Sequence, residues 1–353
     1  MTTAKRKSRA FRKLRVLVLV HQDLVPPDSM EGYSDKEILE WKTEFDVITT
    51  LREMGHEVRP LGVWDDLGVI RKELESWKPH IAFNLLEEFH GIAVYDQHVV
   101  SYLELLRQPY TGCNPRGLML AHDKALCKQI LSYHRIRTPK FAVYPLKRAF
   151  RPTKRLDYPM VVKSVSEEAS LGISQASLVT NEAKLRDRVQ FIHEHVQSDA
   201  LVEEFIEGRE LYVGIIGNQR LQSLPIWELQ FTKSGDKVPL IATAKVKWDE
   251  DYQKRVGVKT GPATGLAENV SAAIVKQCLR TYRALYMTGY ARIDLRLAED
   301  GQAHVLEANP NPNLSYGEDF AESAEVSGLK YEALMHRIIT LGSSYKAAWR
   351  AGE

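Results

Sequence analysis

The chain lacks the features that mark several common classes of protein. It contains neither a GxxxxGK[ST] phosphate loop nor a GxGxxG fingerprint, which disfavours P-loop and Rossmann nucleotide chemistry. Its cysteines, Cys113, Cys127 and Cys278, are odd in number and widely spaced, so we expect no disulfide framework or zinc cluster, and a reducing cytoplasm fits. No apolar run approaches the length of a transmembrane helix, and no membrane partner is expected. The formal net charge of +2 over 353 residues gives no reason to expect nucleic acid as a partner.

Charge of one sign is concentrated only at the N-terminus. Residues 1–13 carry a run of lysines and arginines, which are Lys5, Arg6, Lys7, Arg9, Arg12 and Lys13. We predict a disordered, solvated tail, and a contact with RNA or lipid is the alternative that this pattern leaves open.

Alternating strand and helix patterns over residues 14–120 predict an N-terminal α/β unit. The predicted strands cover Leu14–Val20, His56–Pro60 and His80–Asn84, and the predicted helices cover Asp35–Met54, Leu67–Trp77 and Tyr95–Arg107. This rhythm is typical of an open parallel sheet, which binds ligands at the carboxyl ends of its strands. His21, Asn84 and Glu87 lie at those ends and are candidate substrate residues, although Asn84 and Glu87 would serve equally well in helix capping and a polar loop.

A lysine that ends a strand precedes a run of small residues in the second unit. The strand Tyr158–Lys163 leads into Ser164–Gly172, and Lys124 follows Asp123 on a predicted helix. Phosphates need cationic side chains on rigid elements and a loop whose backbone N–H groups fold over them. The segment therefore suggests a phosphate site, and the alternative is that Lys163 only reaches past apolar neighbours to solvent.

Two consecutive glutamates interrupt the next apolar strand. Leu201–Ile206 carries Glu203 and Glu204, and the chain turns at Gly208 into a strand that carries Glu210. This is a poor pattern for a core and a suitable one for a hinge over which a nucleoside lies.

Oxygen-bearing side chains gather near the C-terminus. The segments YARIDL and HVLEA read as two strands joined by a short turn. Alternation places Arg292 and Asp294 on one face of the first strand, and Glu307 and Asn309 on one face of the second. Two carboxylates and an amide oxygen are hard ligands of the kind that Mg²⁺ prefers beside nucleotide phosphates. The alternative is that these are ordinary charges on the wet face of an antiparallel sheet.

Taken together, these motifs resemble the ATP-grasp superfamily, and most closely the D-alanine–D-alanine ligase family. The resemblance spans Ile81 to Ile339 and rests on motifs that occur in order: Asp123-Lys124, Lys163 with its small-residue loop, EEFIEGRE, Arg292-x-Asp294 and Glu307-x-Asn309. Further matches are Phe83-Asn84-Leu85, Gln108–Gly112, Thr138-Pro139 and Pro262-Ala263. Each motif alone is weak, and their joint order makes chance agreement improbable.

The fold that the resemblance implies is α/β with α+β subdomains. We expect the N-terminal open parallel sheet with its helices over residues 14–120, a central ATP-grasp lid over residues 121–206 and a C-terminal antiparallel-sheet domain over residues 207–353. Because dimers are common among such ligases, a homodimer is a further expectation.

The resemblance also implies roles in nucleotide binding. Lys124 and Lys163 would bind the phosphates of ATP, and the loop from Glu167 to Gly172 would close on the γ-phosphate. Glu203 would meet the adenine amino group, and Glu210 would bind the ribose hydroxyls. The adenine hinge would be the backbone of Glu204, Phe205 and Ile206.

Metal and catalytic roles follow from the same resemblance. Asp294, Glu307 and Asn309 would hold two Mg²⁺ ions, with Mn²⁺ as an alternative. Arg292 would stabilise the acyl phosphate and the tetrahedral intermediate. Lys247 would be the lysine of the mobile loop, an assignment that Lys245 could take instead. Ser170 adjoins Ala169, which stands where the ligases place a serine in the small-residue loop.

The activity implied is that of an ATP-dependent, ADP-forming ligase that joins a small-molecule carboxylate to an amine through an acyl phosphate. One alternative is genuine D-alanine–D-alanine synthesis for the cell wall. Another class of function is a non-catalytic, ATP-binding regulatory protein.

Departures from the family concern the substrates. The N-terminal loop with a Gly-Gly-x-Ser stretch and a glutamate is absent, and the first strand runs into HQDLVPPDS. Where the ligases receive the second substrate's carboxylate on a Ser-Leu pair, this chain has Asn313 and then Glu318 and Asp319. Two carboxylates would repel a substrate carboxylate, so we expect an amine that lacks that group or carries positive charge. Capping of the following helix by Glu318 and Asp319 is the alternative.

Overall fold

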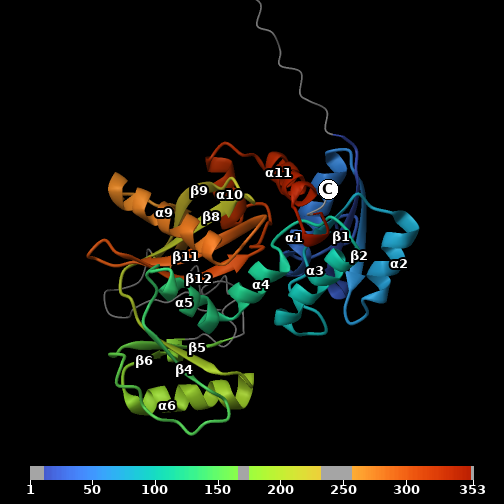
Figure 1. Cartoon of the computed structure of the whole chain (residues 1–353). Coiled ribbons are helices and arrows are strands. Elements are labelled where there is room, and N and C mark those ends of the chain that lie inside the picture. Colours follow the sequence, from blue (N-terminus) through green and yellow to red (C-terminus); the bar gives the residue numbers. More distant parts are fainter. Residues whose placement is uncertain (1–11, 166–174, 232–256, 351–353) are drawn as a thin grey trace, which may run out of the picture.

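The structure is a computed structural model that describes residues 12–165, 175–231 and 257–350. Three sheets organise this part of the chain. In Figure 1 the N-terminal sheet lies on one side, the C-terminal sheet on the other, and the third sheet below the C-terminal one. Within these ranges no helix is long and apolar enough to cross a membrane.

The N-terminal sheet is parallel, as the alternating pattern predicts. Its strands, in the spatial order β2-β1-β3, are β1 (Arg15–His21), β2 (Glu57–Val63) and β3 (Ile81–Asn84). The helices of this unit are α1 (Asp35–Glu53), α2 (Gly68–Trp77) and α3 (Asp96–Leu105). The start of α1 is fixed by a capping box in which Ser34 and Glu37 satisfy each other's backbone N–H groups. The helix ends where Gly55 adopts a φ of +85°, which glycine reaches without strain.

A second, antiparallel sheet forms the lid unit. Its strands, in the order β4-β7-β5-β6, are β4 (Phe141–Tyr144), β7 (Ala200–Glu204), β5 (Met160–Ser164) and β6 (Leu178–Val179). Helix α6 (Glu182–Phe191) covers one face, as Figure 1 shows, and a π-helical turn (Ile192–Val196) follows it. The side chains of this unit form an apolar cluster of their own. The lid therefore has an apolar core separate from the large cluster of the rest of the molecule.

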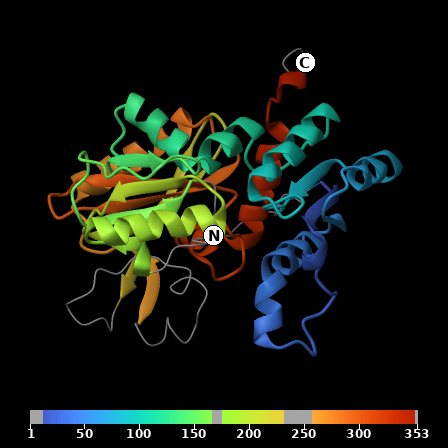
Figure 2. The same cartoon turned by 90° about the horizontal axis from the view of Figure 1, so that it is seen from below.

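The third sheet is also antiparallel and carries the C-terminal half. Its order is β10-β9-β8-β11-β12, with β8 (Arg209–Ile216), β9 (Gln222–Phe231), β10 (Val258–Pro262), β11 (Tyr290–Leu297) and β12 (Ala303–Pro310). The helices are α9 (Glu268–Ala284), α10 (Asp319–Val326) and α11 (Tyr331–Ser344). In Figure 2 this sheet and the lid sheet overlap on the left, and the N-terminal unit lies on the right.

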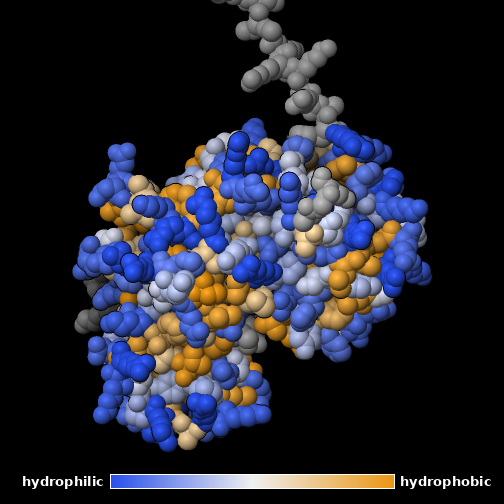
Figure 3. All heavy atoms as spheres, viewed as in Figure 1, coloured by the Kyte–Doolittle hydropathy of each residue, from blue (hydrophilic) through white to orange (hydrophobic). Residues whose placement is uncertain are grey.

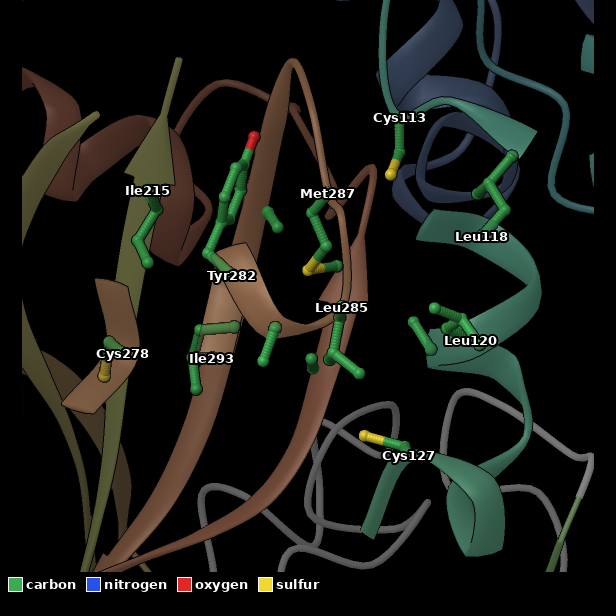
Figure 4. Close-up of a cluster of buried hydrophobic side chains, with 14 of the residues drawn as sticks. Cys113, Leu118, Leu120, Cys127, Ile215, Cys278, Tyr282, Leu285, Met287 and Ile293 are labelled. Atoms are coloured by element: carbon green, nitrogen blue, oxygen red, sulfur yellow. The ribbon is translucent and has the colours of Figure 1, made fainter. Parts of the chain in front are cut away.

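Helices α4 (Pro115–His122) and α5 (Lys124–Tyr133) join the units. Their apolar faces belong to one large cluster that includes side chains from β1 as well as β8, β11 and α9. Figure 4 shows Leu118 and Leu120 of α4 facing Leu285 and Met287, which follow α9. The N-terminal and C-terminal sheets thus share a core. The domain boundaries at residues 121 and 207 remain a proposal, and the apolar side chains of α5 belong to that shared core.

All three cysteines are buried and free, which agrees with the expected absence of a disulfide framework. Figure 4 shows them separated within the shared cluster. Burial raises the pKa of Cys113 and of Cys127 to about 12, so both thiols stay protonated at neutral pH and behave as apolar side chains.

Hydrophilic side chains cover most of the face drawn in Figure 3, and hydrophobic ones gather over α5 and the adjoining lid sheet. Hydrophobic side chains therefore reach the surface at the boundary between the lid and the rest of the molecule, and others show elsewhere on this face.

Candidate active site

Two directly opposed residue pairs form the centre of the site. On β11 and β12, Asp294 lies opposite Glu307 and Arg292 lies opposite Asn309. Opposed residues of an antiparallel ladder project to the same face, so the register brings the four side chains together as the sequence predicts. The predicted antiparallel pairing of these two strands is confirmed.

Arg292 grips Asp294 in a two-point ion pair. Its Nε lies 2.7 Å from Oδ1 and its Nη2 2.9 Å from Oδ2. Burial opposes the charged guanidinium, but Asp294 outweighs that effect and raises the pKa of Arg292, which stays cationic. The guanidinium also lies 4.7 Å from the ring centre of Tyr212, whose face favours a cation. Asp294 is buried, which excludes the alternative of a wet-face charge for this residue.

The donor set fits a hard divalent cation. Glu307 stands across from Asp294, and the buried Nδ2 of Asn309 has no hydrogen-bond partner among the described residues. The two ends of an amide are similar in shape, so a half-turn of the Asn309 side chain would present its oxygen to a cation at that buried position. Among the described residues, no three or more His, Cys, Asp or Glu side chains are grouped so that they could hold a metal. The candidate set of two carboxylates and one amide therefore stays a prediction.

A buried carboxylate between two lysines links the lid to this centre. Glu203 of β7 lies 2.7 Å from Nζ of Lys128 and 3.1 Å from Nζ of Lys163, and its side chain is only 3% exposed. Burial works against its ionised form, yet the two lysines outweigh burial and lower the pKa of Glu203. Glu203 is therefore held as an anion with a fixed orientation.

Lys163 does not extend to solvent. Its side chain is 13% exposed. Burial tends to lower the pKa of Lys163, but Glu203 and Glu307 reverse that effect and raise it. Because Glu307 acts on Lys163, the lid lysine lies within electrostatic reach of the candidate metal ligands.

Lys124 begins helix α5, and Asp123 caps that helix by accepting a hydrogen bond from the Leu126 N–H. The backbone N–H of Lys124 donates to the carbonyl of Val165, at 3.2 Å. Val165 belongs to the small-residue segment and is the last described residue before residue 166, so Lys124 contacts the beginning of that segment.

The predicted hinge directly follows strand β7, which ends at Glu204. The strand begins one residue earlier than predicted, at Ala200, and ends two residues earlier, so Phe205 and Ile206 lie beyond it. The backbone N–H of Phe205 donates to the carbonyl of Pro159, and that of Glu204 to the carbonyl of Lys140. Beyond the hinge, Glu210 of β8 is buried and paired with Arg296, at 2.9 Å.

His21 ends the central strand β1 of the N-terminal sheet and lies close to the loop after β3. Its Nε2 lies 3.4 Å from a carboxylate oxygen of Glu88, and its ring meets Trp64 edge to face. Asn84 is buried and serves the chain itself: its Oδ1 accepts from the Leu86 N–H. For Asn84 the polar-loop alternative therefore describes the contacts better than a substrate role.

Glu87 is exposed and lies within electrostatic reach of Glu44 and Tyr290, whose pKa values it helps to raise. It thus lies where the N-terminal unit meets the beginning of β11.

The loop after β12 is tied to helix α1. Oδ1 of Asn313 accepts from the Ser315 N–H, at 2.7 Å, and from the Thr43 hydroxyl, at 3.0 Å. The Tyr316 N–H donates to Asp46, at 2.8 Å. Asn313 therefore holds the loop in shape, and α1 sets where the loop lies.

Glu318 follows in this loop, at the N-cap position of α10, but its side chain makes no capping hydrogen bond. The Glu318 side chain is exposed at the surface, but partial desolvation by the surrounding protein raises its pKa. The negative charge of Asp319 raises it further. Lys42 and Arg292 oppose that shift. Glu318 thus lies within electrostatic reach of the catalytic candidate Arg292, as Asp319 does.

The predicted basic tail lies almost wholly outside the described residues, as do five of the candidate site residues. They are Glu167, Ser170, Gly172, Lys245 and Lys247. Their roles stay predictions.

Three residues of the site were missed by sequence reasoning: Lys128, Tyr212 and Arg296. Lys128 follows Lys124 by four residues on one helix, which places both on one face and was a usable signal. Tyr212 lies two residues after Glu210 on β8, and Arg296 lies two residues after Asp294 on β11. Strand alternation places each pair on one face, so this signal was also present in the sequence.

Comparisons with known proteins agree with this geometry. The family model for the C-terminus of D-ala D-ala ligase matches residues 129–340. The chain is 34% identical over 303 residues to the uncharacterized protein y4sG of Sinorhizobium fredii, covering 83% of this chain and 85% of that one. It is 30% identical to the D-alanine–D-alanine ligase of Syntrophotalea carbinolica, covering 90% and 95%. The structure of the D-alanine–D-alanine ligase from Bacillus anthracis complexed with ATP superposes with a TM-score of 0.71 at 22% identity, covering 93% and 97%.

The family model and the ligase relatives identify the chain as an ATP-grasp protein, and its parallel sheet with two antiparallel sheets agrees with that fold. The chain belongs to the D-alanine–D-alanine ligase family within that superfamily.

Proposed function

We propose that this protein is an ATP-dependent, ADP-forming ligase that joins a carboxylate to an amine through an acyl phosphate. The observation that carries the proposal is the paired row on β11 and β12, where Arg292 and Asp294 face Asn309 and Glu307. The ATP bound to the relative from Bacillus anthracis and the names of the ligase relatives support it.

The nucleotide would lie between the lid sheet and the C-terminal sheet. Lys124 and Lys163 would bind its phosphates, and Glu203 and Glu210 would receive the adenine amino group and the ribose. Asp294, Glu307 and Asn309 would hold Mg²⁺, or Mn²⁺, at two positions, and the metal would neutralise charge on the transferred phosphoryl group.

The chemistry requires the activation of a carboxylate, which is a poor electrophile. A carboxylate oxygen of the first substrate attacks the γ-phosphorus of ATP, ADP leaves, and an acyl phosphate forms. Lys163 offsets the repulsion between the two anions. The amine then attacks the carbonyl carbon, phosphate leaves with the oxygen that it gained, the nitrogen loses a proton to the departing phosphate, and an amide remains. Arg292 stabilises the oxyanion of that step.

We further propose that the amine carries positive charge or lacks a carboxylate. Glu318 and Asp319 lie within electrostatic reach of Arg292 and occupy the loop that would receive the second substrate. A helix-capping role is less favoured because the Glu318 side chain makes no cap hydrogen bond. Substrate carboxylates are repelled by such a pair and cations are attracted.

Genuine D-alanine–D-alanine synthesis is the competing substrate assignment, supported by the names of relatives such as the Syntrophotalea carbinolica enzyme. A regulatory protein that binds ATP without turnover is the competing class, and retention of Lys124, Lys163, Arg292, Asp294, Glu307 and Asn309 argues against it.

A screen of ADP release separates these assignments. The full chain is incubated with Mg²⁺, ATP, and pairs drawn from amino acids, dipeptides and polyamines, and products are identified by mass spectrometry. We expect turnover that needs both a carboxylate and an amine, with cationic amines preferred. A clear preference for D-alanine as the amine would reject the cationic-amine assignment, and ATP binding without turnover by any pair would favour the regulatory class.

A further inference from the structure

Arg296 extends the row of Arg292 and Asp294 toward the nucleoside end of the site. It lies directly opposite Glu210 on the adjacent strand β8. Its Nη2 is 2.9 Å from Oε2 of Glu210, and each of the two side chains is 8% exposed. A buried arginine thus faces the carboxylate assigned to the ribose.

The same guanidinium reaches the hinge. Nη1 lies 3.5 Å from the carbonyl oxygen of Ile206 and 3.4 Å from that of Gly208. The guanidinium carbon lies 5.1 Å from the ring centre of Phe205. These contacts are long for hydrogen bonds, but a charge in a buried site acts on carbonyl dipoles and on an aromatic face at such distances. One side chain therefore contacts the hinge backbone and the ribose acid together.

The turn at Gly208, between the hinge and Glu210, packs against the end of β11. Gly208 has a φ of +142°, and a Cβ there would lie 2.1 Å from the carbonyl oxygen of Leu297, the residue after Arg296. The path of the chain from the hinge to Glu210 is therefore set by the end of β11.

The other oxygen of Glu210 is also engaged. Oε1 accepts from the Tyr212 hydroxyl, at 3.0 Å. A carboxylate has lone pairs for about four hydrogen bonds, so Arg296 and Tyr212 leave acceptor positions in fixed directions. The acceptor is oriented before a ligand arrives, which reduces the ordering that binding requires.

We propose that Arg296 is a positioning residue that sets the preference of this site for nucleotides with ribose hydroxyls, because it aligns Glu210 with the adenine hinge. The inference rests on the proposed ATP-binding function. The planar fork of arginine matters, since one nitrogen serves the carboxylate and another the hinge carbonyls, and lysine offers no such geometry.

The test compares Mg²⁺-ATP with Mg²⁺-2′,3′-dideoxy-ATP, which lacks both hydroxyls, by titration calorimetry on the full chain. We expect the wild-type chain to prefer ATP by about tenfold or more, the size of one or two charge-assisted hydrogen bonds. Arg296→Met and Arg296→Lys should both reduce that preference to below about threefold, mainly by weakening ATP. Arg296→Lys keeps a positive charge beside the buried Glu210, so this variant should remain folded where Arg296→Met does not.

A matched control is Arg209→Met. Arg209 precedes Glu210, projects to the opposite face, and forms an ion pair with Glu228 at 2.7 Å on the same sheet. This variant should keep the wild-type preference for ATP.

Three results overturn the inference. They are retention of the preference in a folded Arg296 variant, an equal weakening of both nucleotides, and equal binding of both by the wild-type chain. Failure of the wild-type chain to bind ATP at all would instead reject the proposed function.

Discussion

Lys128 of α5 and Glu203 of the lid strand β7 form an enclosed ion pair, 2.7 Å apart, with both side chains almost fully buried. The Lys128 ammonium also donates to the Thr138 hydroxyl, at 2.9 Å, and to the Leu306 carbonyl, at 3.0 Å. Leu306 is the extra residue at the irregularity in the β11–β12 register, directly before Glu307. A single cation therefore ties the predicted adenine acid to the strand that carries a candidate metal ligand.

Lys128→Met should destabilise the protein strongly. Removal of one partner leaves a buried carboxylate short of charge compensation, a change that typically costs about 3 to 5 kcal/mol of unfolding free energy. Urea denaturation and the thermal midpoint measure the loss. The matched control is Lys140→Met, because Lys140 is exposed and 3.7 Å from Glu204. That variant should lose less than about 1 kcal/mol. Equal losses in the two variants would show that the enclosed pair is unimportant.

Asn309→Ala should separate metal binding from stability. The Asn309 Nδ2 has no hydrogen-bond partner among the described residues, so its removal breaks no hydrogen bond of that atom. We expect a thermal midpoint within a few degrees of wild type, roughly the effect of 1 kcal/mol or less. The Mg²⁺ concentration needed for half-maximal nucleotide binding should rise by about tenfold or more. An unchanged Mg²⁺ requirement would remove Asn309 from the metal site.

Arg292→Met should impair turnover far more than nucleotide binding. Loss of a group that stabilises a developing oxyanion lowers kcat by about 10²-fold or more, whereas the Kd for ATP should change little. Arg292→Lys retains the charge but loses the two-point grip on Asp294, so its kcat should be intermediate. Steady-state kinetics with the substrate pair from the ADP screen provide the comparison. A kcat within threefold of wild type would contradict the role given to Arg292.

Glu44 should make stability fall as pH rises. Burial, helped by Glu87, raises the pKa of Glu44 from 4.5 to about 7. The folded state therefore holds more protons than the unfolded state between about pH 4.5 and pH 7, so the free energy of unfolding decreases through that window and levels above it. The full effect is about 3 kcal/mol.

Glu44→Gln isolates this contribution, because a neutral side chain of similar size does not titrate. Thermal midpoints of wild type and variant should be similar at pH 4.5 to 5, and the variant should be the more stable at pH 8. A difference between the two that does not change with pH would show that Glu44 does not titrate in the window given.

The sequence predicted those parts of the molecule that depend on local pattern. Strands β11 and β12 alternate clearly and are joined by a short turn, so their faces and their pairing could both be read from the chain. The parallel β2-β1-β3 sheet was predictable for a similar reason, because helices alternate with its apolar strands.

Other elements could not be read in this way. Strand β9 contains Pro225, and its pairing with β8 shifts register between Val213 and Ile215, so its pattern is irregular. The burial of Lys128 and Arg296 depends on acceptors that are distant in sequence, such as Leu306 and Glu210. Local propensity treats such side chains as surface charges, and only the tertiary fold supplies their partners.

The measurement that tests the central claim most directly follows an oxygen atom. The carboxylate substrate found in the ADP screen is labelled with ¹⁸O at both carboxylate oxygens, and the released phosphate is analysed by mass spectrometry. Because the carboxylate attacks the γ-phosphorus and its oxygen leaves with the phosphate, the account predicts one ¹⁸O atom in each phosphate released with amide product. Unlabelled phosphate, formed together with the amide, would contradict activation through an acyl phosphate.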